Sequence, residues 1–294
     1  MKIAVLYIAT GRYMTFWDDF HASAEKHFLP GVQKAYFVWT DDLDAGQRYD
    51  NVHVIPAARR GFPWDTLMRF EMFLEAGEEL SKFDYIFFMN ANIMFVGDVL
   101  PEHVLPRSDM GEGGLVAARH PYVDKNRHPD TFPYDRNPMS SAFIPKGIGK
   151  YYLSGAFNGG AASDYLKMAG VLANNTRHDF ENMNVSVRGR RGPWAHVHDE
   201  SHLNRYLLDR EFRALDPSFG MPERSWLRMS DEARATVQLI SRDKTSPKYG
   251  GLAWLRGQTD RRVRVNPVLK ALLRVLGGLC PSRRGRRWLR SFYG

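Results

Sequence analysis

Short apolar runs alternate with helix-like stretches through the first 90 residues, and this alternation constrains the fold most strongly. The runs are rich in β-branched and aromatic side chains and occupy residues 2–9, 34–40, 52–56 and 85–89. Residues 16–28 and 65–80 instead predict helices, the second with apolar side chains at helical spacing and Asp65 at its N-cap. Strands that alternate with helices indicate an α/β fold with a mostly parallel sheet.

Polar residues follow two of these predicted strands, at the sheet edge where ligands of such folds bind. Thr10 follows the first strand, and Asn90 and Asn92 follow the fourth. Because side chains alternate along an extended chain, Asn90 and Asn92 can face the same side. Amides can hydrogen-bond sugar hydroxyls or phosphate oxygens, but they lack the charged oxygens that Mg²⁺ prefers. An ordinary turn after a strand is the alternative interpretation.

The charge of the chain is concentrated at its C-terminal end. The 294 residues carry a formal net charge of +8, but residues 261–294 hold ten of the 41 Lys and Arg and no acid. The remaining 31 basic and 33 acidic residues give 1–260 a net charge of −2. We therefore predict one folded domain over 1–260 and a basic extension over 261–294. The single cysteine excludes an intrachain disulfide and fits a reducing cytoplasm, and the apolar start fits a first buried strand better than a signal peptide.

The basic extension has an amphipathic pattern. Residues 266–279 place Val268, Leu272 and Leu276 on one helix face, and residues 281–293 interleave arginines with aromatic side chains. This pattern suits peripheral binding to an anionic membrane surface. A helix packed on the body, followed by a disordered tail, is an equal alternative. Nucleic-acid binding is disfavoured, because the charge is terminal and no recognition motif accompanies it.

Several segments carry a family pattern in the same order along the chain. They are "MRFEM", "NAN", "YDRNP", "AFIPKGIGKYY", "YYLSGAFNGG" and "HDESHLNRYLL", all between about Ile3 and Arg256. Together they resemble the family 6 glycosyltransferases, and Asn-Ala-Asn is similar to the pattern of the bacterial, metal-independent branch. The resemblance implies a GT-A type fold, which is a single Rossmann-like domain with a mixed sheet flanked by helices. It also implies retaining transfer of galactose or N-acetylgalactosamine from a UDP-sugar to the 3-hydroxyl of a galactoside, without a metal or other cofactor.

The resemblance also implies a set of donor-binding residues. The uracil and ribose contacts would be Ile8, Ala9, Thr10 and Tyr13, and the set near the diphosphate would be Arg69, Asn90, Ala91, Asn92, Lys244 and Lys248. Arg242 and Arg256 lie in the same C-terminal region as the two lysines. Without a metal ion, cationic side chains must stabilise UDP as it leaves. For any single lysine, a solvated basic loop is the alternative.

The catalytic residue implied by the resemblance is Glu200 in "HVHDESH", with Asp199 beside it in contact with the donor sugar. A carboxylate on the β face of that sugar can attack C1 or stabilise an oxocarbenium-like centre. The first turn of a helix favours its ionised form by roughly 0.3–1 kcal/mol. His120 matches a histidine that contacts the acceptor galactose. We expect His198 to line the acceptor site, and His202 to be structural or to line it too.

Donor choice is expected to depend on the segment "YYLSGAF". Leu153 and Gly155, with Ser154 between them, resemble the pattern of transferases that use N-acetylgalactosamine. The small Gly155 leaves space for an acetamido group, whereas Tyr152 and Phe157 are expected to be packing residues.

We therefore predict transfer from UDP-GalNAc to a galactose, with a 2-fucosylated galactose or a lipid-linked bacterial glycan as the acceptor to be tested. UDP-galactose as donor is the first alternative. A non-catalytic sugar-binding protein is an alternative of another class, favoured by the amides at Asn90 and Asn92 and opposed by Glu200. The predicted location is the cytoplasm, at the inner face of the membrane if the extension binds lipid.

Overall fold

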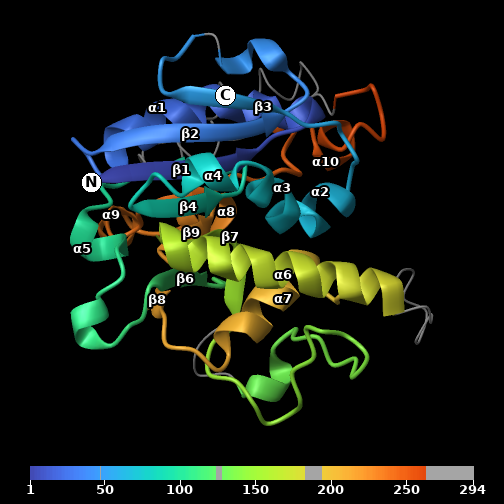
Figure 1. The fold of residues 1–294 in the computed structure, drawn as a ribbon. Helices are drawn as coiled ribbons and strands as arrows, with labels where there is room; N and C mark the ends of the chain where they lie inside the picture. The colour runs from blue at the N-terminus through green and yellow to red at the C-terminus, as the bar shows by residue number, and fades with distance from the viewer. Residues whose placement is uncertain (47, 124–127, 183–193, 263–294) are drawn as a thin grey trace.

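The computed structural model describes residues 1–46, 48–123, 128–182 and 194–262, and it confirms the α/β architecture. At its centre is a seven-stranded sheet with the order β3-β2-β1-β4-β7-β6-β8 (Figure 1). Its strands are β1 (Lys2–Ile8), β2 (Gln33–Thr40), β3 (Val52–Pro56), β4 (Tyr85–Met89), β6 (Leu115–Arg119), β7 (Leu153–Ala161) and β8 (Arg213–Leu215). The sheet is mixed, because β7 runs antiparallel to β4 and β6 while the other pairs are parallel. The four runs predicted from the sequence are β1 to β4.

A second, three-stranded sheet has the order β5-β10-β9. Its strands are β5 (Ile93–Phe95), β9 (Phe219–Pro222) and β10 (Leu239–Ser241). The chain enters β5 directly after Asn92, so the Asn90-Ala91-Asn92 segment connects the two sheets. The pairing of β10 with β5 also brings the residues after Ser241 to this junction.

The helices lie on both faces of the large sheet. They are α1 (Trp17–His27), α2 (Trp64–Leu67), α3 (Arg69–Glu75), α4 (Gly77–Leu80), α5 (Pro101–Val104), α6 (Ala162–Asn182), α7 (His198–Leu207), α8 (Glu223–Trp226), α9 (Asp231–Ala235) and α10 (Leu252–Leu255). Short 3-10 turns are η1 (Gly11–Phe16), η2 (Leu43–Gly46), η3 (Ser108–Met110), η4 (Pro129–Thr131) and η5 (Pro247–Tyr249). In Figure 1 the long α6, in yellow, runs beside α7, and it packs on α3 as well.

β1 shows how the sequence produces two cores. Ile3, Val5 and Tyr7 pack with α1 and the small sheet, whereas Ala4 and Leu6 pack with α3, α6 and α7. Both faces of β1 are therefore buried, which explains why its sequence is a continuous apolar run rather than an alternating one. With both faces covered, a ligand can reach the central strands only at their ends.

The prediction of one continuous helix over 65–80 with Asp65 as its N-cap is wrong on both points. The chain forms α2, α3 and α4 as three short helices, and α2 begins at Trp64. Asp65 is therefore inside the first turn and is not the N-cap. Its carboxylate accepts hydrogen bonds from the backbone N–H groups of Arg60 and Gly61 at 3.0 and 3.1 Å, which folds the preceding loop back onto α2.

The predicted membrane-binding extension falls almost entirely on residues 263–294, which lie outside the described residues. Across the described ranges, none of the helices has the length and hydropathy that crossing a membrane would require.

Candidate active site

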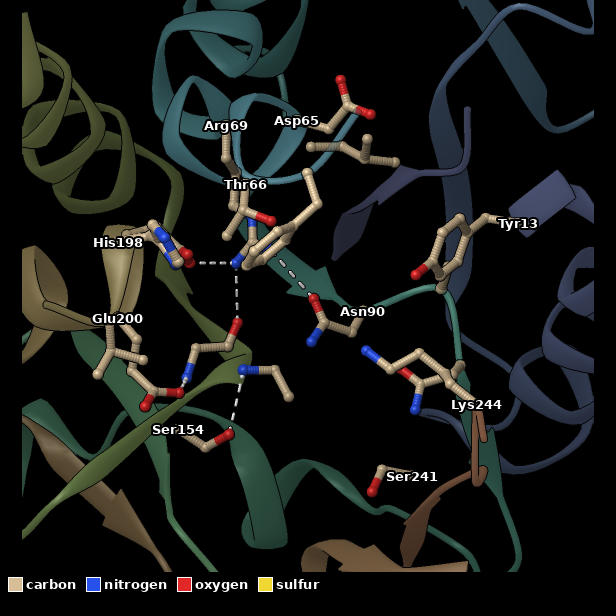
Figure 2. A pocket seen from close by; sticks show the side chains of 18 of the residues that line it. Tyr13, Asp65, Thr66, Arg69, Asn90, Ser154, His198, Glu200, Ser241 and Lys244 are labelled. Carbon is tan, nitrogen blue, oxygen red and sulfur yellow. Dashed lines mark hydrogen bonds and ion pairs between the residues drawn. The ribbon is translucent and has the colours of Figure 1, made fainter. Parts of the chain in front are cut away.

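A cavity of about 520 Å³, here called the main cavity, opens at the carboxyl ends of the parallel strands. It is lined from the ends of β1, β4 and β6, the start of β7, the first turn of α7 and the residues after β10. The first residues of the antiparallel β7 lie at the same edge as the last residues of its parallel neighbours. Strand ends from separate parts of the sequence therefore converge on one hollow (Figure 2).

The end of β1 forms one wall. Ile8, Thr10 and Tyr13 line the main cavity as predicted, and the Thr10 hydroxyl donates a 2.8 Å hydrogen bond to Asp65. Ala9 does not line the cavity. Its side chain is buried in the core beside α1, because alternation along the strand turns it away from its two neighbours.

A buried ion pair forms the floor. The guanidinium of Arg69 pairs with Asp199 and donates to the Gly155 carbonyl at 3.0 Å and to Asn90 Oδ1 at 3.1 Å. It also lies 4.0 Å from the centre of the Phe88 ring. Arg69 therefore joins β4, β7 and α7, but Asp199 balances its charge, so it is less available to a diphosphate than the sequence suggests.

Asn90 and Asn92 both line the main cavity, with Ala91 between them. The oxygen of the Asn90 side chain faces the Arg69 guanidinium, and the amide of Asn92 donates to the Arg242 carbonyl at 2.8 Å. Neither side chain carries the negative charge that divalent cations prefer in their ligands, and the Asn90 oxygen already accepts a hydrogen bond from Arg69. Across the described ranges, no three His, Cys, Asp or Glu side chains gather in a metal-binding arrangement.

Both oxygens of Glu200 are held by hydrogen bonds. The Tyr152 hydroxyl donates to Oε1 at 2.6 Å, and the backbone N–H of Gly155 donates to Oε2 at 2.7 Å. Burial raises the pKa of Glu200, and these two donors lower it in part. Desolvation thus outweighs the helix-terminus effect expected from the sequence. Burial also raises the pKa of Asp199 to about 6, while the neighbouring Arg69 opposes that rise.

Asn204 fixes the position of the first turn of α7 against β7. Its amide donates to the carbonyls of Leu153 and Glu200, each at 2.8 Å, and its oxygen accepts from the Leu153 N–H at 2.8 Å. Because Asn204 lies one helical turn after Glu200, it ties the backbone of the acid to the strand that supplies its hydrogen-bond donors.

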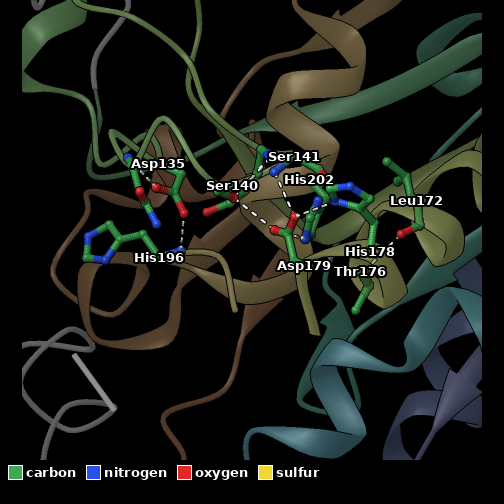
Figure 3. Close-up of polar contacts among 12 residues, drawn as sticks. Asp135, Ser140, Ser141, Leu172, Thr176, His178, Asp179, His196 and His202 are labelled. Carbon is green, nitrogen blue, oxygen red and sulfur yellow. Dashed lines mark hydrogen bonds and ion pairs between the residues drawn. The ribbon is translucent and has the colours of Figure 1, made fainter. Parts of the chain in front are cut away.

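Two buried carboxylates fasten the irregular segment before β7 to neighbouring parts of the structure (Figure 3). Asp135 accepts hydrogen bonds from the backbone N–H of His196 at 2.7 Å and of Asn137 at 2.8 Å. Asp179, at the end of α6, accepts from Ser140 Oγ at 2.9 Å and from the Ser141 N–H at 2.8 Å. The irregular segment before β7 is therefore fastened to both α6 and the start of α7.

His202 belongs to this structural layer and does not line the main cavity. It is buried, its Nε2 lies 3.7 Å from Asp179 Oδ2, and burial lowers its pKa. Of the two roles that the sequence left open, the structural one therefore fits its position.

The cations of the C-terminal region divide into two groups. Lys244 lines the main cavity and faces Glu200 across it, with Asn90 between them (Figure 2). No carboxylate among the described residues pairs with it, and burial lowers its pKa, as do Arg256 and Arg69. Arg256 also lines the cavity and stacks over Phe62 at 4.2 Å.

Lys248 and Arg242 are corrections to the sequence prediction. Lys248 lies outside the main cavity, where its Nζ is 3.9 Å from Glu223 and 5.1 Å from the centre of the Tyr249 ring. Arg242 is 2% exposed and pairs with Asp19. A loop has no periodicity that would tell an inward-facing cation from an outward-facing one, so the sequence could not separate these residues from Lys244.

Leu153 is a further correction. Ser154 and Gly155 line the main cavity, but Leu153 is buried in the core beside α6 and borders a separate cavity of about 350 Å³. The register of β7 against β6 shifts between the partners of Ala117 and Arg119. This irregularity does not turn Leu153 away from the side that Gly155 faces, because a Cβ at Gly155 would meet Asp199 and Glu200 of α7. Leu153 is kept out of the cavity because α7 covers it, with Asn204 bonded to its backbone.

The predicted acceptor residues line the main cavity. His120 and His198 both line it, and burial lowers the pKa of each imidazole. Neutral imidazoles can both donate to and accept from sugar hydroxyls. His198 has a φ of 53°, and its ring meets Phe62 edge-on at 5.0 Å.

Three residues with clear contacts were missed by the sequence reasoning. Tyr152 was assigned to packing, yet its hydroxyl binds Glu200. Tyr122 and Arg59 line the cavity from loops and were not considered. For Tyr122, an aromatic residue two positions after His120 could have served as an indication, whereas nothing in the local sequence separates Arg59 from Arg60.

Comparisons with known proteins point to one family. A family model described as Glycosyltransferase family 6 matches residues 1–240. The O-antigen biosynthesis glycosyltransferase WbnI of Escherichia coli is 32% identical over 255 residues, which cover 85% of this chain and 98% of that protein. Globoside alpha-1,3-N-acetylgalactosaminyltransferase 1 of Gallus gallus is 29% identical over 221 residues, covering 71% of this chain and 58% of that one. Histo-blood group ABO system transferase 1 of Rattus norvegicus is 27% identical over 230 residues, covering 74% and 60% respectively.

Proposed function

This chain belongs to glycosyltransferase family 6, and from that membership we propose that it transfers N-acetylgalactosamine from UDP-GalNAc in α1,3 linkage to a galactose, with retention and without a metal ion. It is a glycosyltransferase that acts with a nucleotide-sugar donor and a glycan acceptor. The observation that carries the finer proposal is the pair formed by Glu200 and Lys244, which face each other across the main cavity.

Glu200 is proposed to act at the anomeric carbon. When the bond between C1 and the diphosphate oxygen breaks, its electron pair leaves with UDP and positive charge develops at C1. A carboxylate on the opposite face can stabilise that charge or bond to C1. The acceptor hydroxyl then forms the new bond to C1, and its proton goes to the departing UDP. The hydrogen bonds from Tyr152 and Gly155 keep the Glu200 oxygens in one orientation throughout.

Lys244 is proposed to stabilise the departing UDP. The negative charge that develops on the diphosphate needs a cation already in place, and a partly desolvated ammonium without a carboxylate partner suits this role. Arg69 contributes indirectly, because it orients Asn90 while Asp199 balances its own charge. The amides Asn90 and Asn92 would then hydrogen-bond the donor rather than ligate a metal.

Gly155 supports UDP-GalNAc as the donor, and UDP-galactose remains the alternative. The residue lines the cavity next to Glu200, and a Cβ there would press on Asp199 and Glu200, so a glycine leaves these carboxylates in place beside the proposed donor sugar. The N-acetylgalactosaminyltransferase named among the relatives acts on globoside, which is consistent with this donor. Leu153 does not support the choice of UDP-GalNAc as donor, since it does not line the cavity.

The test is transfer to a galactoside panel in excess chelator by wild-type protein and Glu200→Gln. We expect wild-type activity to be unaffected by the chelator and to fall at least about a hundredfold in the variant, because the charged group at C1 is lost. Glu78→Gln, an exposed change in α4, is the matched control and should be fully active. Binding of UDP-sugars with no transfer by any of the three proteins would instead support the non-catalytic sugar-binding alternative.

The acceptor is proposed to be a galactose of a bacterial surface glycan built on a lipid carrier, with a 2-fucosylated galactose tested first. WbnI is named for O-antigen biosynthesis, and this relative supports a surface glycan. A location at the inner face of the membrane, through residues 261–294, would bring the enzyme to such an acceptor. Plain and fucosylated galactosides, compared at equal concentration, test the acceptor.

A further inference from the structure

Arg59 lines the main cavity from the loop between β3 and α2, and its side chain makes specific packing contacts and a hydrogen bond there. It lies against two glycines with left-handed backbones, Gly11 with a φ of 58° and Gly257 with a φ of 61°. A Cβ at Gly11 would stand 3.0 Å from Arg59 Cδ, and one at Gly257 would stand 1.8 Å from Arg59 Nη2. The same Nη2 donates to the carbonyl of Arg256. The guanidinium is thus placed where the end of β1 meets the C-terminal end of α10.

Apart from the Arg69–Asp199 pair, the cavity around Arg59 is lined by two carboxylates, Asp65 and Glu200, and by three cations. Arg59, Lys244 and Arg256 all line the main cavity, and among the described residues no carboxylate forms an ion pair with any of them. Arg256 contributes to lowering the pKa of Lys244, so these two cations repel each other in the free protein. Three cations against two carboxylates leave a net positive charge, which favours the binding of an anion.

We propose that Arg59 binds the diphosphate of the donor, as a third cation beside Lys244 and Arg256. The proposal rests on the proposed use of a UDP-sugar. A planar guanidinium can donate two parallel hydrogen bonds to phosphate oxygens, which an ammonium cannot do. Arg69 also lines the cavity but is paired with Asp199, so Arg59 supplies charge that Arg69 does not.

The competing role for Arg59 is purely structural, as a clamp between the loop and α10. The two roles differ in what they do to uridine, which lacks phosphate. Loss of a phosphate contact weakens UDP binding and leaves uridine binding unchanged, whereas loss of a clamp disturbs the whole cavity and weakens both.

The experiment measures binding of UDP, UMP and uridine to the full chain by calorimetry, for wild type, Arg59→Gln and Arg59→Lys. For Arg59→Gln we expect the Kd for UDP to rise about tenfold, with the Kd for uridine changed less than about twofold. Arg59→Lys should bind UDP more tightly than Arg59→Gln but less tightly than wild type, because lysine keeps the positive charge but cannot donate two parallel hydrogen bonds. Arg60→Gln is the matched control, since Arg60 does not line the cavity, and it should bind all three ligands as wild type does.

Equal UDP affinity in wild type and Arg59→Gln would overturn the inference, and so would parallel losses for UDP and uridine with a lowered Tm. Either result would leave the proposed function intact. Wild-type protein that binds neither UDP nor uridine would overturn the proposed function together with the inference.

Discussion

At the scale of single residues, Tyr152 differs from an ordinary packing side chain because its hydroxyl binds Glu200. Its ring packs with Phe132, Tyr134 and Ile144, as an apolar aromatic position would suggest. Its hydroxyl, however, leaves this cluster and donates to Glu200 at 2.6 Å. Tyr152 is therefore a positioning residue, which connects the packing of the irregular segment to the proposed catalytic acid.

Replacing Tyr152 with Phe should shift the pH dependence of transfer. The hydrogen bond from Tyr152 stabilises the ionised carboxylate and so lowers the pKa of Glu200. Its removal raises that pKa, so the acid limb of the kcat profile should move to higher pH. At neutral pH we expect kcat to fall roughly tenfold to a hundredfold, as for a lost hydrogen bond to a charged group.

The control is Tyr134→Phe, because the Tyr134 hydroxyl donates to the Tyr151 carbonyl and does not touch Glu200. It should leave the acid limb where it is in wild type. If Tyr152→Phe lowers the rate equally at every pH, Tyr152 only supports packing.

Gly155→Ala tests the basis of donor choice. A Cβ at this position would stand 3.0 Å from Asp199 Oδ2 and 3.3 Å from Glu200 Cβ, so the methyl group would force these two side chains to shift at the floor of the cavity. We expect the ratio of kcat/KM for UDP-GalNAc over UDP-galactose to fall about tenfold, since the larger sugar loses more room. Gly170→Ala, in α6 with open space around it, is the matched control. An unchanged ratio in the Gly155 variant would exclude this steric explanation.

At the scale of elements, the same particular residues show what the sequence could and could not predict. Asn90, Asn92 and Thr10 were placed correctly because a strand end is visible in the sequence as the end of an apolar run. Leu153 was misplaced because α7 covers it, and which residues of a strand a helix covers depends on tertiary packing that local spacing does not reveal. Lys248 was misplaced, and Arg59 missed, because the direction of a loop side chain is set by tertiary contacts.

The anchoring of α7 gives a prediction at this scale. Asp135→Asn keeps the shape of the side chain but replaces one of the two oxygens that accept from the backbone of His196 and Asn137. A partly buried hydrogen bond to the buried Asp135 side chain is then lost, which should destabilise the protein by about 1–3 kcal/mol. Urea unfolding measures this, and kcat should fall as well because the segment leads directly into the first turn of α7.

Asp130→Asn provides the comparison for Asp135. Asp130 accepts from the Gly147 N–H at 2.6 Å, but this contact is exposed, so water can replace it. We expect its effect on stability to be within about 0.5 kcal/mol. Similar urea midpoints for both variants would show that the Asp135 contacts do not hold the entry to α7.

At the scale of the whole molecule, the excess of basic residues and the residues that line the main cavity lie in different parts of the chain. All lining residues of the main cavity lie between Ile8 and Arg256. Residues 263–294 hold eight of the 41 basic residues and no acid, so residues 1–262 carry 33 basic and 33 acidic residues and are neutral overall. Binding to an anionic membrane and transfer of the sugar should therefore respond to different substitutions.

The last prediction uses the full chain with Arg283, Arg284, Arg286 and Arg287 all changed to Gln. Each basic residue near an anionic surface contributes about 1 kcal/mol, so four substitutions should nearly abolish co-sedimentation with phosphatidylserine vesicles at low salt. Transfer to a soluble galactoside should stay within about twofold of wild type, since no cavity residue is altered. Neutral vesicles, which should pellet neither protein, control for apolar binding. Undiminished pelleting of the variant on anionic vesicles would show that these charges do not hold the protein at a membrane, and the packed-helix interpretation of the extension would then be the better one.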